Sequence, residues 1–194
     1  MKRIIVLIFL SISCSANAGL LYSSGSATID SPICDAENCS GSSEWWVIDD
    51  FTNSLNWNIT GLEFFSNLNF GSLLDYMSTS WEIVSSSDPY GAALFSGTGV
   101  ATITGNSYLL SGLDINLSSG TYFLSHHHDF STEVTTTAML TGDQGSFYQT
   151  DKSNYQFTYD GEVAINIYGK EVSVPEPSPL VLLARISHSA PTTF

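Results

Sequence analysis

Apolar and polar residues alternate with a period of two along most of this chain. In segment 55–65, Leu55, Trp57 and Ile59 recur at every second position. Successive side chains of a β-strand point to opposite faces, so this spacing predicts a half-buried strand with these three side chains on its buried face. Similar patterns predict strands over 20–29, 44–51, 79–84, 92–105, 107–117, 120–130, 134–140, 155–161 and 162–169.

Turn residues such as Ser-Gly, Gly-Asn and Asp-Gly separate these segments at short intervals. Apolar residues at the helical period of 3.6 are confined to one short candidate helix, 71–77. Many short strands with regular turns are typical of a sandwich or a barrel. We therefore expect a single all-β domain over 19–172, an antiparallel two-sheet β-sandwich of jelly-roll type, with a β-barrel as the alternative.

The first eighteen residues predict export. Two basic residues at positions 2–3 precede an apolar stretch over 4–12, and Ala16-Asn17-Ala18 offers the small residues that a signal peptidase reads. The apolar stretch is too short to span a membrane as a helix. Segment 1–18 is therefore predicted to be a secretory signal peptide that is cleaved after Ala18.

The cysteines are consistent with export. Cys14 would be the lipidated residue of a lipoprotein signal, but Ser11 stands where such signals usually carry leucine, so we prefer simple cleavage. Cys34 and Cys39 remain in the mature chain, with four residues between them. An even pair in an exported chain predicts one disulfide that closes a small loop.

Charge narrows the range of partners. The chain has 5 Lys and Arg residues against 19 Asp and Glu, and loss of the signal leaves three basic residues, a net charge of −16. Such a chain repels phosphate backbones and anionic membranes, so we expect no binding to nucleic acid. Cations and neutral polar polymers remain candidate partners. Hydrophobic residues make up 43% of the chain, which is enough for a core and excludes disorder.

Three consecutive histidines lie in segment 125–131, SHHHDFS. On a strand His126 and His128 point to one face, and His127 and Asp129 to the other. Imidazoles bind transition metals, but a stable site needs three or four ligands, and the sequence does not identify a third. The alternative, which we prefer, is a strand end whose histidines cap the edge of the sandwich or face solvent.

The sequence motifs give little support for a catalytic function. The chain has no G-x-S-x-G motif, and the adjacent Asp49 and Asp50 would face opposite sides of a strand, so they cannot form a glycosidase pair. We therefore expect no catalytic residue and no cofactor. Asp143 and Asp151, in the polar segment 141–151, are candidates to share a structural calcium ion, although no EF-hand loop is present.

Adjacent tryptophans make the best case for a ligand. Trp45 and Trp46 must point to opposite faces if they lie on a strand. One is expected in the core, and the other is a candidate platform for a sugar ring. The alternative is that the core covers one and a loop covers the other.

The C-terminal stretch INIYGKEVSVPEPSP resembles the end of bacterial PEP-CTERM proteins. In that family an exported β-rich domain precedes a sorting motif, a membrane-spanning helix and a basic cluster. A membrane protease, the exosortase, is thought to read this tail. The segments DDFTNSLNWNITGLEFF, ALFSGTG and LDINLSSGTYFLS also resemble a β-sandwich that recurs in the family. The sorting motif matches at Val174, Pro175, Glu176, Pro177 and Ser178.

The resemblance implies a Gram-negative source and a non-catalytic surface or extracellular-matrix protein associated with exopolysaccharide, processed by exosortase. A carbohydrate-binding module that uses exposed aromatic side chains is the alternative, and a metal-dependent or hydrolytic enzyme comes third. The tail, 173–194, departs from the family. Its apolar run, 180–184, has five residues where a membrane helix needs about twenty. We therefore expect a truncated or frame-shifted sorting signal, and a protein released outside the cell or at its surface without stable membrane anchoring.

Overall fold

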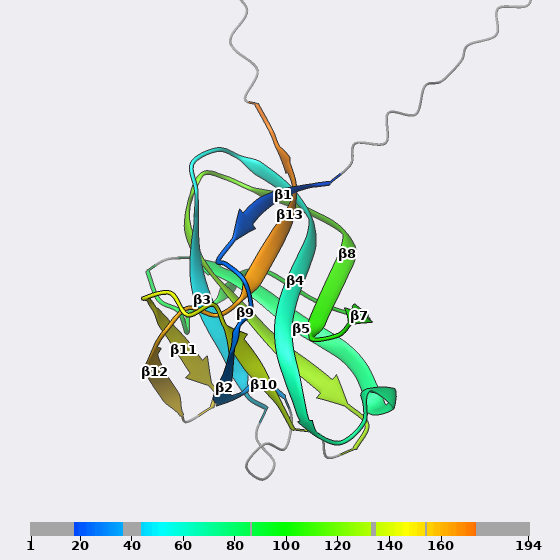
Figure 1. Ribbon diagram of the computed structural model, residues 1–194. Coiled ribbons are helices and arrows are strands. Elements are labelled where there is room, and N and C mark those ends of the chain that lie inside the picture. The colour runs from blue at the N-terminus through cyan, green and yellow to red at the C-terminus, as the bar shows by residue number, and fades with distance from the viewer. Residues whose placement is uncertain (1–17, 37–43, 86, 133–134, 154, 174–194) are drawn as a thin grey trace, which may run out of the picture.

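The computed structural model describes residues 18–36, 44–85, 87–132, 135–153 and 155–173 (Figure 1). Most of the signal segment, Cys39 and the sorting motif 174–178 lie outside these ranges. The predictions of signal cleavage, of the Cys34–Cys39 disulfide and of sorting therefore stay predictions. Within the described residues, no helix is long and apolar enough to cross a membrane.

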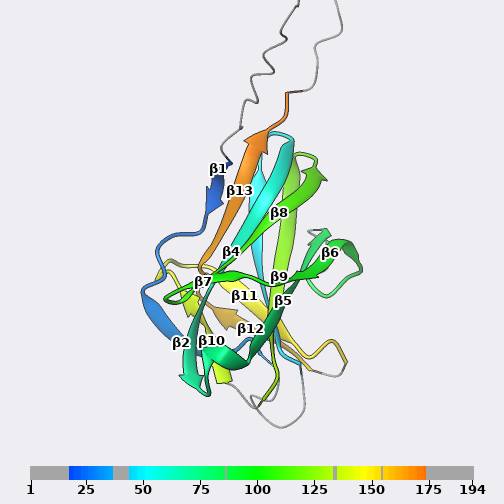
Figure 2. The ribbon, with the colours of Figure 1, turned by 90° about the vertical axis from the view of Figure 1, so that its right-hand side faces the viewer.

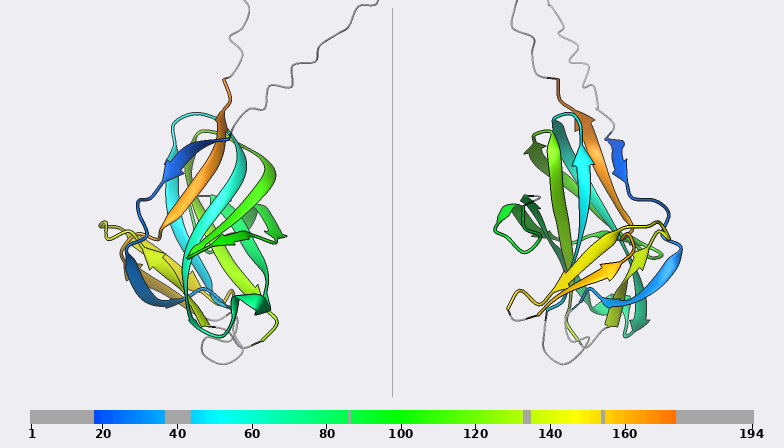
Figure 3. Two further views of the ribbon diagram at one scale, coloured as in Figure 1. Left: turned by 45° about the vertical axis from the view of Figure 1, so that its right-hand side comes forward. Right: turned by 90° about the vertical axis from the view of Figure 1, so that its left-hand side faces the viewer.

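Two antiparallel β-sheets pack face to face, which confirms the predicted all-β sandwich (Figures 1 and 3). The seven-stranded sheet contains β1 (Gly19–Ser23), β2 (Ile29–Cys34), β4 (Trp57–Phe70), β7 (Thr102–Thr104), β8 (Ser107–Leu117), β10 (Thr135–Leu140) and β13 (Ile165–Glu171). The six-stranded sheet contains β3 (Trp46–Asn53), β5 (Tyr76–Ser85), β6 (Ala93–Gly99), β9 (Gly120–Phe130), β11 (Ser146–Thr150) and β12 (Gln156–Asp160).

The chain passes from one sheet to the other at most of its connections. The hairpins β5–β6, β7–β8 and β11–β12 stay within one sheet. Repeated crossing is shared with jelly rolls, although these two sheets hold more strands than an eight-stranded jelly roll. β1 pairs with β13, with Gly19 opposite Gly169, so the first and last strands lie side by side at one end of the sandwich (Figure 2).

A bulge in β4 changes which residues face the core. Trp57 and Ile59 are buried as predicted, but the pairing of β4 with β8 shifts between Ile59 and Gly61. Beyond this shift Leu62 and Phe64 are buried, so the core-facing residues change from odd-numbered to even-numbered positions. Leu55 does not share the buried face, because it precedes β4 and is 49% exposed.

Two other segments differ from expectation. The candidate helix 71–77 is reduced to a 3-10 turn, η1 (Leu73–Asp75), whose first turn is capped by the Ser72 hydroxyl. The polar segment 141–151, treated as a loop, contains strand β11. Within β11, Phe147 is buried in the core, whereas the next residue, Tyr148, packs on the outer face of the sheet.

The core lies between the sheets and draws on both. Its strands contribute mainly branched aliphatic and aromatic side chains, which suit a pleated surface. The largest side chains that are fully buried include Tyr108, Phe51, Phe64, Phe147, Ile48, Ile59, Leu62, Ile83, Leu124, Ile165, Ile167 and His126. This set includes the imidazole of His126, which belongs to β9.

We predict that Leu62→Ala lowers the free energy of unfolding by about 2–5 kcal/mol, because it leaves a cavity between the sheets. Leu55→Ala, the matched control, should change it by less than ~0.5 kcal/mol, because Leu55 is exposed. Chemical denaturation followed by tryptophan fluorescence measures both. Equal losses would contradict the placement of the bulge.

Candidate functional site

His126 and His128 point from β9 into the interior of the sandwich, where they are 1% and 0% exposed. The ring of Phe64 stacks on His126 with centroids 4.4 Å apart, and the ring of Tyr108 stacks on His128 at 4.2 Å. The interpretation that these histidines cap an edge or face solvent is therefore wrong. β9 is a central strand, flanked by β3 and β5, and the opposite sheet covers its inner face.

Asp35 is the third member of this group, and it comes from the segment that follows β2. The backbone N–H of His128 donates to the Asp35 carbonyl over 2.8 Å, and Ala36 forms a parallel bridge with His128. The chain thus crosses from the seven-stranded sheet onto β9 at this point. The crossing leaves the Asp35 carboxylate fully buried beside the two imidazoles.

We call Asp35, His126 and His128 the Asp/His cluster. Asp35 Oδ2 lies 3.3 Å from His126 Nε2 and 3.8 Å from His128 Nε2. Potential ligand atoms of the three residues all lie within 4.8 Å of one another, and no other such group of three occurs in the described part of the chain. Local periodicity could place the two histidines on one face, but nothing in the sequence pairs them with a residue 91 positions away.

Hydrogen bonds extend the cluster to both sheets. The Ser66 hydroxyl of β4 donates to Asp35 Oδ2 and lies 3.0 Å from His128 Nε2. Since that hydroxyl has one hydrogen, His128 Nε2–H must donate to it. His128 Nδ1 then accepts from the Thr79 hydroxyl of β5 at 2.8 Å. This pattern describes a neutral imidazole protonated at Nε2.

Ser66, His128 and Asp35 resemble a catalytic triad in composition only. In a triad the carboxylate holds the imidazole nitrogen that faces away from the serine. Here Asp35 accepts from the serine itself, and Thr79 occupies the far nitrogen of His128. Ser66 is 1% exposed, so a substrate has no access to its hydroxyl. The arrangement does not support nucleophilic catalysis.

Burial and hydrogen bonding oppose each other in this cluster. Burial disfavours an ionised Asp35, but hydrogen bonds from His126 and Ser66 and the nearby imidazoles lower the pKa of that carboxyl below its usual value. Burial lowers the pKa of His128, which favours the neutral ring. Asp35 Oδ1 is buried with no hydrogen-bond partner among the described residues. The carboxylate therefore remains only partly satisfied.

His127 and Asp129 face the other side of β9, as predicted. His127 Nε2 lies 3.1 Å from Asp129 Oδ1, and Nδ1 donates to the carbonyl oxygen of Trp45. Although burial opposes it, these contacts raise the pKa of His127. The ring of Trp46 stacks on this imidazole with centroids 5.5 Å apart.

Trp46 is not available as a sugar platform. Its other contact is Lys152, whose Nζ lies 3.3 Å from the centre of the indole and 2.5 Å from Glu82 Oε2. Trp46 is 8% exposed as a result. The alternative, in which the core covers one tryptophan and a loop the other, fits in part: Lys152 of the β11–β12 hairpin turn covers Trp46, but Trp45 is half-buried and lies outside the core between the sheets.

Trp45 is half-buried and packs at the sheet edge. Its ring lies 6.3 Å from that of Tyr155 and 6.1 Å from that of Phe157. Tyr155 and Phe157, which are 55% and 41% exposed, stack with their planes 4° apart. β12 is the edge strand of the six-stranded sheet. The exposed aromatic surface predicted at the tryptophan pair therefore lies mainly on residues next to it.

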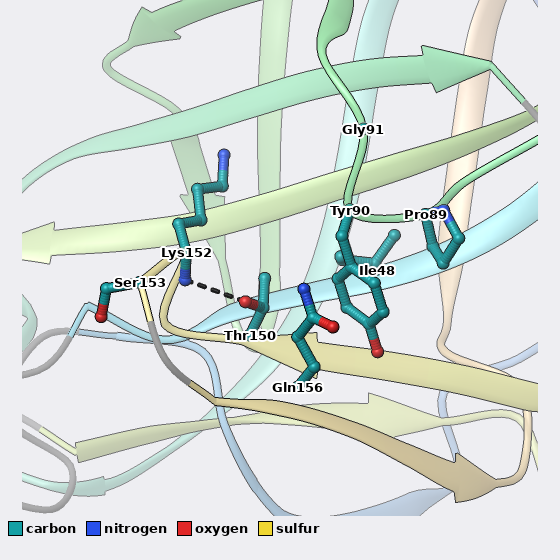
Figure 4. Close-up of a pocket in the computed structure, with 8 residues that line it drawn as sticks. All are labelled: Ile48, Pro89, Tyr90, Gly91, Thr150, Lys152, Ser153 and Gln156. Atoms are coloured by element: carbon teal, nitrogen blue, oxygen red, sulfur yellow. Dashed lines mark hydrogen bonds between the residues drawn. The ribbon is translucent and has the colours of Figure 1, made fainter.

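A groove lies on the outer face of this sheet, beside the same hairpin (Figure 4). It has a volume of about 300 Å³, and we call it the β11–β12 groove. Tyr90 and Gln156 lie next to each other in it, and Thr150 accepts from the backbone N–H of Lys152 at 2.9 Å. Its lining consists of Ile48, Pro89, Tyr90, Gly91, Thr150, Lys152, Ser153 and Gln156.

The structure does not place Asp143 and Asp151 in one loop. Asp143 lies three residues before β11 and Asp151 directly after it, and the five residues of this strand extend over about 17 Å at ~3.3 Å per residue. The Asp151 carboxylate instead accepts from the backbone N–H groups of Ser153 and Tyr155, which closes the hairpin turn. The prediction of a shared ion requires 141–151 to fold back on itself, whereas an extended strand occupies its middle.

Comparison of the chain with protein-family models, with curated proteins and with solved structures finds no match. The resemblance to PEP-CTERM proteins therefore stays a prediction that rests on the sequence motifs.

Asp49 is a second buried carboxyl, separate from the Asp/His cluster. As expected, Asp49 and Asp50 face opposite sides of the strand, and it is Asp49 that faces the interior while Asp50 faces solvent. Burial raises the pKa of Asp49 to about 8, and the charges of Glu162 and Asp50 add to this rise, although the Val163 and Asp50 N–H groups donate to its carboxylate. Tyr22 also approaches Glu162, with its hydroxyl 3.5 Å from Glu162 Oε1.

We predict that Asp49 makes the protein less stable as the pH rises from about 4 to 8. Its pKa is 3.8 in an ordinary setting and about 8 here, so across this window the folded chain keeps a proton that the unfolded chain has released. The unfolding free energy then falls by at most ~1.4 kcal/mol per pH unit.

Asp49→Asn should flatten this slope, and Asp160→Asn, at an exposed position of β12, should leave it unchanged. Denaturant titrations at several pH values measure the slopes. An unchanged slope in Asp49→Asn would show that Asp49 is ionised throughout.

Proposed function

We propose that this protein is an exported, non-catalytic β-sandwich that associates with extracellular polysaccharide through the β11–β12 groove. The observation that carries the proposal is the lining of this groove. Tyr90 offers an aromatic ring, Gln156 offers an exposed amide, and Ser153 offers a hydroxyl oxygen that donates its hydrogen to Asp151 and can accept from a ligand. A ring flanked by neutral donors and acceptors is suited to a sugar, which has apolar C–H faces and hydroxyl edges.

Charge favours a neutral polymer. The chain carries a formal net charge of −14, which disfavours anionic polysaccharides at long range. Lys152 does not reverse this preference locally, because Glu82 neutralises its ammonium group. Binding is favoured over hydrolysis, since the eight lining residues include no carboxylate or imidazole.

The exposed rings of Tyr155 and Phe157 extend the available contact area. Gln156, the first residue of β12, belongs to the groove, and Tyr155 and Phe157 flank it in sequence. Phe157 points to the other face of the strand. A polymer that leaves the groove over this edge strand would meet apolar ring surface. This continuity favours a chain-like ligand over a single small molecule.

We predict that the purified protein binds one or more neutral polysaccharides in affinity electrophoresis or on a glycan array. Gln156→Ala and Tyr90→Ala should each weaken binding about tenfold, since each removes a direct contact. Tyr90→Phe keeps the ring and removes the hydroxyl group, which donates to the Phe157 carbonyl at 3.1 Å, so it tests the contribution of the ring to binding separately from that of the hydroxyl.

Tyr168→Ala is the matched control, because Tyr168 lies on β13 in the other sheet and bonds to Glu63 there. It should leave binding unchanged. Failure to bind any neutral polysaccharide, or equal loss in Tyr168→Ala, would contradict the proposal and leave a structural role in the matrix.

Export has its own test. We predict that the protein is recovered outside the cell with Gly19 as its first residue, because Ala16-Asn17-Ala18 fits a signal peptidase site. Fractionation followed by N-terminal sequencing measures this. A lipid-modified N-terminus at Cys14 would favour the lipoprotein alternative, and retention in the cytoplasm would refute export.

A further inference from the structure

We propose that the Asp/His cluster is a structural transition-metal site of the zinc class, formed by Asp35, His126 and His128 between the two sheets. This inference is independent of polysaccharide binding, because the cluster lies inside the sandwich and the β11–β12 groove lies on its outer face. It rests on three features: the donor set, the spacing of the donor atoms, and a buried carboxylate that has no lysine or arginine partner in the described part of the chain.

The donor set suits zinc and its neighbours in the periodic table. Two imidazoles and one carboxylate bind Zn²⁺, Co²⁺ or Ni²⁺, whereas calcium and magnesium prefer oxygen ligands throughout. Ser66 lies against both Asp35 and His128 and is the nearest further oxygen. A metal with two imidazoles and one carboxylate keeps one position for that hydroxyl or for water.

The spacing also fits. Bonds of about 2.0–2.1 Å in a tetrahedral site place ligand atoms about 3.3 Å apart. Asp35 Oδ2 and His126 Nε2 are 3.3 Å apart, and Asp35 Oδ2 and His128 Nε2 are 3.8 Å apart. All three donor atoms lie within 4.8 Å of one another, so the two imidazole nitrogens and the carboxylate oxygen need to move inward by at most about 1.5 Å relative to one another to meet on one ion.

The outer contacts resemble those of a metal site. Ligating histidines usually donate their second ring N–H to an acceptor, which fixes the ring. His128 has this partner in Thr79, whose hydroxyl lies 2.8 Å from Nδ1 and would accept once the ring proton moves to that nitrogen. Phe64 and Tyr108 stack on the two imidazoles and restrict their rotation.

The buried carboxylate needs a positive partner. An ionised carboxylate is costly to bury unless a charge or several donors compensate it. Asp35 is fully buried, and its Oδ1 has no hydrogen-bond partner among the described residues. The described lysines do not serve, since Lys152 binds Glu82 and Lys170 is exposed. Within the described residues, the remaining ways to offset this charge are a proton, on Asp35 itself or on a histidine, and a metal ion.

Metal uptake should accompany folding. The three ligands are at most 1% exposed, so an ion has no open path into the folded sandwich. The purified chain, made without a polyhistidine tag, is unfolded in denaturant with a chelator and freed of metal. It is then refolded with Zn²⁺ or Co²⁺ under conditions that keep its cysteines oxidised.

We expect about one ion per refolded chain, tetrahedral Co²⁺ absorption in the visible region, and a higher melting temperature with the metal than without it. Asp35→Asn and His128→Gln should lower the metal content to roughly a tenth of this. His127→Gln is the matched control, because His127 is the neighbouring histidine on the opposite face, and it should retain the metal.

The wild-type chain decides the question even if a variant fails to fold. A wild-type chain that refolds to the same circular dichroism spectrum with no bound metal would overturn the proposal and assign the neutralisation of the cluster to a proton on Asp35 or on a histidine. Equal metal content in wild type, Asp35→Asn and His128→Gln would also overturn it, because the ions would then bind elsewhere.

Discussion

The attachment of Asp35 to β9 is the contact on which much of this sandwich depends. The backbone of residues 35–36 leaves the seven-stranded sheet and bonds to His128 in the centre of the other sheet. A β-sandwich is usually held together by apolar packing alone. Here the buried Asp35 carboxylate adds to that packing. It accepts a hydrogen bond from Ser66 of one sheet, and its neighbour His128 bonds to Thr79 of the other sheet. The relative position of the two sheets is thereby fixed at this end of the molecule.

Local sequence patterns predicted the strands and the faces of their side chains more successfully than they predicted burial. Period-two spacing placed His126 and His128 on one face and His127 on the other, as observed. It could not show that β9 lies in the middle of a sheet, because that depends on pairing with β3 and β5. Asp35 was missed for the same reason. Its role arises from a contact between segments distant in sequence, for which neither composition nor spacing carries a signal.

Bulges and coverage by distant residues explain the other differences. The shift between Ile59 and Gly61 reverses the parity of β4, so a single pattern could not describe the whole strand. The sequence predicts that one of Trp45 and Trp46 is buried and that the other is a candidate platform, but it does not show that Lys152, more than one hundred residues later, covers the ring of Trp46. The β11–β12 hairpin therefore has two roles. It covers one aromatic residue of β3, and it supplies half of the residues that line the groove where we place a polysaccharide.

The pairing of β1 with β13 has a consequence for the order of folding. The first strand of the domain finds its sheet partner only in the last, with Gly19 opposite Gly169. A chain that emerges from its N-terminus cannot complete this edge until nearly all of the domain has been delivered. Contacts of such large sequence separation slow folding and leave early strands unpaired in the meantime. β1 is short, with exposed or half-buried residues, which limits the risk that it pairs with another molecule while it waits.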